Sequence, residues 1–142
     1  MQSFYDWYWN RFVDSANGEL DYKNMPSAED VLHRRPAVLS QELIDLMDRD
    51  AKEAKAQQAA PNMDFDPIVG GNGGASGRYN VQSVVVSQGV CRAVMTGNEH
   101  VKPELKQTKS GWVFIDFRYG FDSADVKTRD LPDVDLLQVL KR

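Results

Sequence analysis

The polar residues with the best spacing for chemistry are Asp116 and Arg118, in the stretch Lys109–Gly120, KSGWVFIDFRYG. Residues two apart on a β-strand share one face of a sheet, so we expect these two side chains to be neighbours. A desolvated carboxylate has a raised pKa and can act as a general base. The pair could instead form an ion pair within the sheet or orient a neighbouring turn. We favour the structural role, and Asp116 and Arg118 are the only candidate catalytic residues.

A second group of candidates surrounds the glycine-rich stretch Gly70–Gly77. Asp64 and Asp66 precede it with the spacing that opens a calcium loop, but the later carboxylates of such a loop are missing. The stretch lacks the Gly-Lys-Ser/Thr ending of a P-loop and does not lead from a strand into a helix. We expect the two aspartates to cap their own turn. Together with Gly70 and Gly71, they are candidates for contact with a partner.

Histidine and cysteine are too sparse for a metal site or a recognisable nucleophile. Cys91 is the single cysteine, so an internal disulfide and a multi-cysteine metal site are excluded. It lies in an apolar run and is expected to be a small buried residue. His33 and His100 lack the spacing of zinc ligands. We predict no cofactor, no metal and no enzymatic activity.

Charge and hydropathy narrow the class of partner. The 142 residues carry a net charge of −4, with a pI near 5.1. A protein that binds the phosphates of nucleic acid needs a basic stripe, so nucleic acid is excluded as a partner, whereas an acidic surface suits a basic protein. No apolar stretch approaches the roughly 20 residues that span a bilayer, and no signal peptide is recognisable. Trp7 and Tyr22 are candidate exposed aromatic contacts.

The elements that position these residues divide into a helical part and a β part. Aromatic residues at helical spacing predict a helix that begins at Ser3, and a second long helix is predicted over Leu39–Ala59. The short turns that follow require antiparallel strands. These strands are predicted at Tyr79–Ser87, Val90–Thr96, Glu99–Thr108 and Trp112–Tyr119.

This order predicts an α+β fold, in which N-terminal helices pack on one face of a curved, antiparallel, four-stranded sheet. The last strand has large apolar residues at both odd and even positions, which predicts that both of its faces are covered. Residues 1–142 are expected to form one domain. Its parts are a helical segment over 3–60, a loop over 70–77, a β meander over 79–119 and a short C-terminal helix over 132–141.

Four motifs along the chain belong together: the aromatic helix Phe4–Tyr8, the Leu-Ser-x-Glu-Leu helix start at Leu39–Leu43, the Asp66-Pro67 loop, and the Gly-Trp-x-x-x-Asp-x-Arg-Tyr stretch at Gly111–Tyr119. In this order they resemble the motifs of bacterial YbjP/YqhG-type envelope proteins. That family belongs to the nuclear transport factor 2-like, or cystatin-like, superfamily. The resemblance implies a cone, in which a curved sheet wraps against helices with a pocket between them.

The resemblance also implies where such a protein works and what it does. Family members usually carry an export signal, often a lipoprotein signal, so the chain is expected to be a periplasmic domain whose signal has been removed; a cytoplasmic location is the alternative. The superfamily includes isomerases, dehydratases, binding proteins and immunity proteins against interbacterial toxins, so the fold does not settle the function.

Three functions therefore remain open. The first is a non-enzymatic binding protein of the bacterial envelope, acting by protein–protein contact, with inhibition of a secreted toxin or effector as one form of it. The second is a pocket protein that binds a small ligand or acts as an isomerase or dehydratase through Asp116. The third is a structural accessory domain. Another protein is the expected partner, and a homodimer is a further option.

Overall fold

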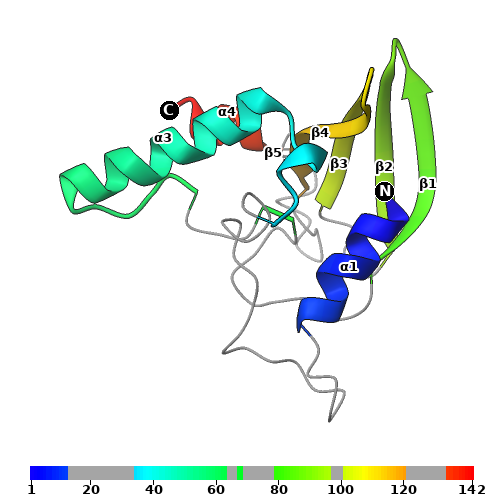
Figure 1. Ribbon diagram of the computed structural model, residues 1–142, viewed down its shortest axis with the longest axis horizontal. Helices are drawn as coiled ribbons and strands as arrows, with labels where there is room; N and C mark the ends of the chain where they lie inside the picture. Colours follow the sequence, from blue (N-terminus) through cyan, green and yellow to red (C-terminus); the bar gives the residue numbers. More distant parts are fainter. Residues whose placement is uncertain (13–33, 64–66, 69–78, 97–100, 121–133) are drawn as a thin grey trace, which may run out of the picture.

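The computed structural model describes residues 1–12, 34–63, 67–68, 79–96, 101–120 and 134–142. Within them the fold is α+β with one antiparallel sheet, in the order β1-β2-β3-β4-β5 (Figure 1). The elements in chain order are α1 (Gln2–Phe12), the 3-10 turn η1 (Pro36–Val38), α3 (Gln41–Gln57), β1 (Asn80–Ser87), β2 (Val90–Thr96), β3 (Val101–Thr108), β4 (Gly111–Tyr119), β5 (Val134–Asp135) and α4 (Leu136–Leu140).

The meander of four long strands is confirmed, with each strand within two residues of its predicted bounds. The predicted number of strands and the start of the last helix were wrong. Val134 and Asp135 form a fifth short strand beside β4, where the sequence predicted helix. The backbone of Asp135 is extended, and α4 begins only at Leu136. Pairing with the end of β4 satisfies backbone groups that a helix starting at Pro132 would have left without partners.

A β-bulge explains why β4 is apolar at both odd and even positions. Leu105 of β3 lies opposite Phe114, whereas its neighbour Glu104 lies opposite Asp116, so Ile115 is an extra residue in β4. The bulge brings Phe114 and Phe117 to the same face, where both are buried and their rings stack at 5.1 Å. The pattern of apolar residues had predicted large side chains on both faces of β4, whereas these two phenylalanines lie on the same face.

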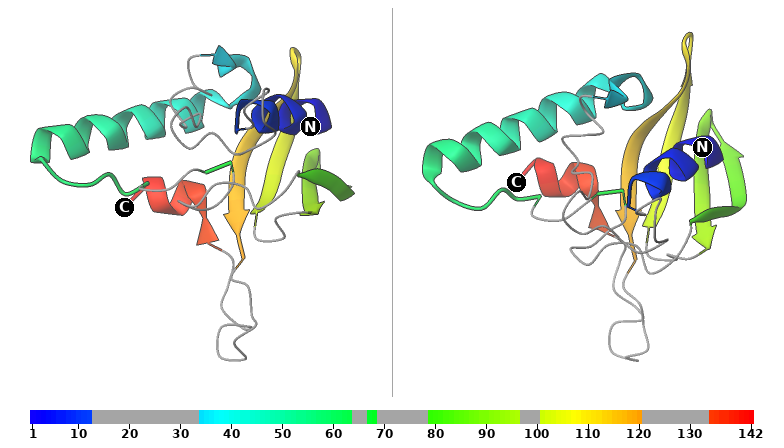
Figure 2. Two further views of the ribbon diagram at one scale, coloured as in Figure 1. Left: turned by 90° about the horizontal axis from the view of Figure 1, so that it is seen from below. Right: turned by 60° about the horizontal axis from the view of Figure 1, so that its bottom comes forward.

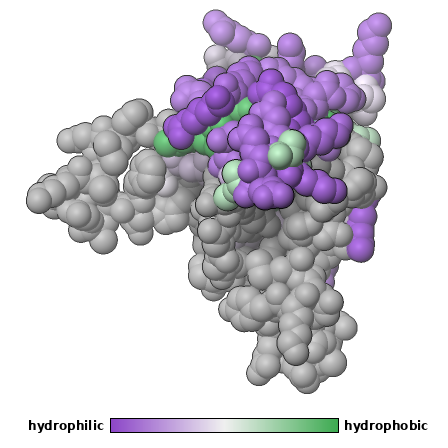
Figure 3. Space-filling view, turned by 90° about the vertical axis from the view of Figure 1, so that its left-hand side faces the viewer, coloured by the Kyte–Doolittle hydropathy of each residue, from purple (hydrophilic) through white to green (hydrophobic). Residues whose placement is uncertain are grey.

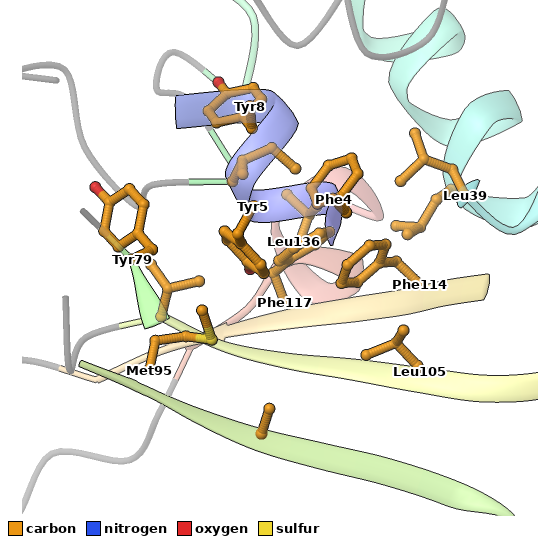
Figure 4. Packing of buried hydrophobic residues seen from close by; sticks show 14 of the residues in the cluster. Phe4, Tyr5, Tyr8, Leu39, Tyr79, Met95, Leu105, Phe114, Phe117 and Leu136 are labelled. Carbon is orange, nitrogen blue, oxygen red and sulfur yellow. The ribbon is translucent and has the colours of Figure 1, made fainter. Parts of the chain in front are cut away.

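An aromatic cluster joins α1 to this face of the sheet (Figure 4). Phe4 and Tyr5 point from the helix toward Phe114 and Phe117, and the Phe4 and Phe114 ring centroids are 4.9 Å apart. The helix begins one residue earlier than predicted. The backbone N–H groups of Phe4 and Tyr5 donate to the carbonyl of Met1, so Ser3, where the sequence predicted the helix to begin, lies inside the first turn.

The long helix α3 is capped at both ends, and its buried side faces α4. The Ser40 side chain accepts a hydrogen bond from the Leu43 N–H, and Gln58 ends the helix in a left-handed conformation with φ of 52°. The buried residues of the helix are Leu43, Leu46, Met47 and Asp50. Figure 3 shows that the described surface on this side of the molecule is mostly hydrophilic.

The helices cover the two ends of the sheet unequally. In Figures 1 and 2, α3 and α4 lie at the β4–β5 end, whereas α1 crosses one face toward the β1–β2 hairpin. The free edge of β4 is covered along much of its length. Near the middle of β4, the chain before α3 lies alongside, and the Ser40 N–H donates to the Phe114 carbonyl at 2.8 Å; the end of β4 pairs with β5. At the opposite edge, every residue from Gln82 to Gly89 is exposed.

Candidate functional site

Two carboxylates and two arginines meet on the face of the sheet opposite the aromatic cluster. The register places Glu104 between Arg92 of β2 and Asp116 of β4, so the three side chains form a row across three strands. The Arg92 Nε–H donates to Glu104 Oε1 at 2.6 Å. Glu104 and Asp116 are both buried, whereas about half of the Arg92 side chain is exposed. The row is therefore accessible from the arginine end.

Arg118 joins the same network from the next position on β4. Its Nε lies 2.8 Å from Glu104 Oε1 and 3.3 Å from Asp135 Oδ1, although neither contact has hydrogen-bond geometry. Arg118 therefore links β3 to β5 across its own strand. Asp116 and Arg118 share a face as predicted, but the carboxylates that approach Arg118 are those of Glu104 and Asp135.

Asp116 anchors α4 to the sheet. Its Oδ1 accepts hydrogen bonds from the backbone N–H of Phe117 at 2.9 Å and of Leu137 at 3.1 Å. Burial raises the pKa of Asp116 above its ordinary value of 3.8, and the nearby charges of Asp135 and Glu104 add to the rise, while the two backbone hydrogen bonds oppose it. A buried acid with a raised pKa is what a general base requires, but these hydrogen bonds already orient the carboxylate toward the backbone.

An apolar groove lies on the opposite face, between the β1–β2 hairpin and the start of α1. It has a volume of about 270 Å³. Its lining residues are Met1, Gln2, Val81, Val84, Cys91, Leu105 and Trp112. Trp112 and Val84 are 42% and 52% exposed, which is high for large apolar side chains. Cys91 is buried, as predicted, and is one of the residues that line the groove.

Sequence reasoning missed this groove because its residues come from five separate elements. Trp112 was assigned to a strand with both faces covered, and Val84 falls within the strand predicted at Tyr79–Ser87. The signal that could have identified the groove is the run Val84-Val85-Val86, in which no polar residue alternates with the apolar ones, although the strand is at the edge of the sheet. The sequence alone does not say which strands lie at the edges.

The groove and the carboxylate row are separate. Asp116 lines neither the groove nor either of two other pockets that are formed by described residues. The other two are a nearly filled space of about 10 Å³ under α3 and an open hollow of about 490 Å³ between α3 and the β3–β4 turn. Within the described residues, no group of three or more histidine, cysteine, aspartate and glutamate side chains could hold a metal ion.

Of the six residues predicted to contact a partner, the structure describes only Trp7. Trp7 is partly buried against the aromatic cluster rather than fully exposed, and the Arg35 guanidinium lies 4.8 Å from its ring centroid. The other five candidates lie outside the described residues, as do His33 and His100. Those five are Tyr22, Asp64, Asp66, Gly70 and Gly71.

Comparisons with known proteins leave the family of this chain open. Searches against protein-family models, curated proteins and solved structures found no match. None of the helices in the described part of the chain is long and apolar enough to cross a membrane. Any function must therefore be argued from the groove, the carboxylate row and the edges of the sheet.

Proposed function

We propose that this protein is a non-enzymatic binding protein that acts by contact with another protein, and that the groove beside Trp112 is its contact surface. The observation that carries the proposal is the exposure of Trp112 and Val84 around an apolar depression. Exposed tryptophan next to apolar side chains is typical of the centre of protein interfaces.

The size and charge of the molecule favour a protein over a small ligand. The groove, of about 270 Å³, is an open depression lined mainly by apolar side chains, so it suits one or two apolar side chains of a partner. The net charge of −4 favours a partner with a basic surface, because opposite charges speed association and exclude acidic competitors. The expected partner is a basic protein that inserts an apolar side chain beside Trp112.

Site-specific photo-crosslinking in the source cell tests this proposal. A photoreactive residue at Val84 should give an adduct with a basic protein, heavier than the chain but distinct in mass from two copies of it. The Trp112→Ala change should remove that adduct while leaving the circular dichroism spectrum unchanged. The matched control places the photoreactive residue at Lys52, on the exposed side of α3, where we expect no such adduct.

Adducts from Lys52 and Val84 in equal yield, or an adduct that survives Trp112→Ala, would rule out the groove as the contact surface. The absence of any adduct other than a dimer of the chain would reject the proposed function itself.

The finer description of the protein is also a proposal. Helices that precede a β meander, and that pack on one face of it, support a nuclear transport factor 2-like cone. The resemblance to YbjP/YqhG-type envelope proteins also leads us to expect that the protein works in the periplasm and that its partner is a secreted toxin or effector. Co-expression of the chain with a candidate toxin tests this step, because an immunity protein must restore growth. The structural accessory domain remains an alternative with no observation of its own.

A second candidate function rests on Asp116. Its burial and raised pKa favour a small-ligand or isomerase-like site, with Arg118 nearby as a positive charge. Three observations count against it: the carboxylate is held by two backbone N–H groups, Arg118 approaches other carboxylates, and Asp116 does not line the groove or the two other pockets described above. A soaked or co-crystallised ligand in contact with the Asp116 carboxylate would support this candidate over the groove.

A further inference from the structure

The edge strand β1 carries an unusual combination of exposure and neutrality. Its three central valines, Val84, Val85 and Val86, are between 52% and 65% exposed. From Asn80 to Gly89 the sequence is NVQSVVVSQG, which contains no charged residue and no proline. Soluble proteins usually protect an edge strand with charges, proline or a covering element, because an open edge pairs with other strands.

The geometry of the hairpin identifies which backbone groups face the open edge. β1 and β2 are joined by the two-residue turn Gln88-Gly89, in which both residues have positive φ, as a type I′ turn requires. In such a hairpin the closing pair, Ser87 and Val90, is hydrogen-bonded, and hydrogen-bonded pairs then alternate along the ladder. Val84 and Val86 therefore direct their N–H and C=O groups away from β2, toward the open edge.

The open part of this edge has two defined ends. At the turn side it stops at Gln88. At the other side the ladder is irregular between Val81 and Ser83, and there the side chain of Gln2 takes the place of a neighbouring strand. The Gln2 amide accepts from the Val81 N–H at 2.8 Å and donates to the Tyr79 carbonyl at 3.2 Å. The regular, uncovered segment that remains is Ser83–Ser87.

This segment reads the same in both directions: Ser-Val-Val-Val-Ser. A palindromic strand is self-complementary when two copies pair antiparallel about a two-fold axis. With the axis at Val85, each serine lies opposite a serine, and Val84 lies opposite Val86 of the partner subunit. Those opposing valines are the residues whose backbone groups face the edge, so the register makes four hydrogen bonds and places the two Val85 side chains in contact.

From this match we propose that a second copy of this chain occupies the β1 edge, which joins two five-stranded sheets into one continuous sheet across the two-fold axis. Charge supports the choice of occupant. Two copies of a chain with net charge −4 repel one another, and the uncharged strip Asn80–Gly89 is where they can approach with least repulsion. The dimer leaves the groove beside Trp112 on one face, so this proposal is independent of the proposed function.

The dimer should be weak. Five residues of strand bury much less than the roughly 800 Å² per partner of a standard protein interface. We therefore expect a monomer at about 1 µM and a measurable dimer at a few hundred µM in sedimentation equilibrium. Val85→Lys places two like charges opposite each other and should leave a folded monomer at every concentration, because Val85 is exposed in the monomer.

A cysteine scan tests the register itself. In a Cys91→Ala background, Val85→Cys places two thiols across the axis in a pair without hydrogen bonds, with Cα atoms about 4.5 Å apart, which suits a disulfide. We expect mild oxidation to convert this variant to a covalent dimer. Val84→Cys should cross-link far less, because its nearest counterpart across the edge is residue 86. Val94→Cys, also exposed but on β2, is the matched control.

The proposal is overturned if the unaltered chain remains monomeric at several hundred µM, or if Val85→Cys cross-links no faster than Val94→Cys. Faster cross-linking of Val84→Cys than of Val85→Cys would overturn the palindromic register. All of these outcomes are measured on the purified chain. They therefore do not depend on whether the groove binds a partner in the cell.

Discussion

Glu104 is the residue that holds the polar network of the sheet together, and the sequence did not single it out. Its buried carboxylate forms ion pairs with both Arg92 and Arg118, which come from the neighbouring strands β2 and β4. Glu104 stands next to Pro103 in a segment without an obvious pattern, and only the register shows that it lies opposite Asp116. Spacing along one strand identified Asp116 and Arg118 as neighbours, but the partners of each come from other strands, which spacing cannot reveal.

Replacing Glu104 should destabilise the fold. Glu104→Gln removes the charge between the two arginines and should lower the free energy of unfolding by about 1–2 kcal/mol in a urea titration. The control is Glu53→Gln, because Glu53 is exposed and its ion pair with Arg49 spans 3.8 Å. This control should stay within about 0.5 kcal/mol of the unaltered chain. Equal losses in both variants would mean that the network adds nothing to stability.

Asp116 should make stability depend on pH in a particular direction. Because burial raises its pKa above 3.8, the folded chain holds this proton more tightly than the unfolded chain does. The contribution of Asp116 to the free energy of unfolding therefore falls as pH rises from 3.8 through the raised pKa, and it stays low above that range. The Asp116→Asn side chain cannot ionise, but its amide oxygen can still accept hydrogen bonds from the backbone N–H groups of Phe117 and Leu137.

Urea titrations at a series of pH values provide the measurement. The stability of Asp116→Asn relative to the unaltered chain should increase as pH rises through this range and then level off. A difference that is flat with pH, or that decreases, would mean that the pKa of Asp116 is not raised in the folded chain.

At the scale of elements, the sequence predicted the strands well and the local irregularities poorly. Short turns and apolar runs located all four long strands. The bulge at Ile115 was invisible, because an extra residue leaves no compositional mark and shows only in the register with β3. The helix predicted over 132–141 is present as α4, but its predicted start was wrong for a related reason: Val134 and Asp135 pair with the edge of β4, a tertiary effect that outweighs local helix signals.

The segment that follows α3 is held against the helix by Asp50, a buried charged residue on a helix that otherwise buries apolar ones. Its two carboxylate oxygens accept hydrogen bonds from the backbone of Asn62 and Met63 and from the Asn62 side chain, at 2.8–3.0 Å. Asp50→Ala should therefore cost about 1–3 kcal/mol in chemical denaturation, because these donors lose their partner. Asp48→Ala, on the exposed side of the same helix, should change stability by less than about 0.5 kcal/mol. Similar values for the two would contradict this role.

Two substitutions in the β1–β2 turn should change the stability of the protein in opposite directions. Gln88 has φ of 52° and Gly89 has φ of 76°, and the type I′ turn favours asparagine followed by glycine at these positions. Gln88→Asn should raise the melting temperature slightly, whereas Gly89→Ala should lower stability by about 1–2 kcal/mol, since alanine is strained at positive φ. If both changes lower the melting temperature, the turn is of another type.

At the scale of the whole molecule, the sequence predicted the class of fold but not the location of its surfaces. The α+β class and the packing of α1 on the meander followed from aromatic spacing and strand order. The groove beside Trp112 and the open edge of β1 could not be predicted, because both depend on which strands lie outermost and on what the helices leave uncovered. The cone and the envelope setting stay predictions.

The two faces of the sheet thus differ: the buried carboxylates of Glu104 and Asp116 lie on one face, and the groove beside Trp112 lies on the other. Glu104, Asp116 and their arginines tie β2, β3, β4 and α4 together. Trp112, Val84 and their neighbours remain open. The central claim of this account is that the first set maintains the fold and the second set makes contact with a partner.

One measurement tests that claim most directly. The photo-crosslinked adduct formed from Val84 in the source cell should be compared between Trp112→Ala and Asp116→Asn, with both variants shown to be folded by circular dichroism. The account predicts that Trp112→Ala removes the adduct and that Asp116→Asn retains it at the yield of the unaltered chain. Loss of the adduct in Asp116→Asn, with retention in Trp112→Ala, would contradict the account and assign function to the carboxylate row.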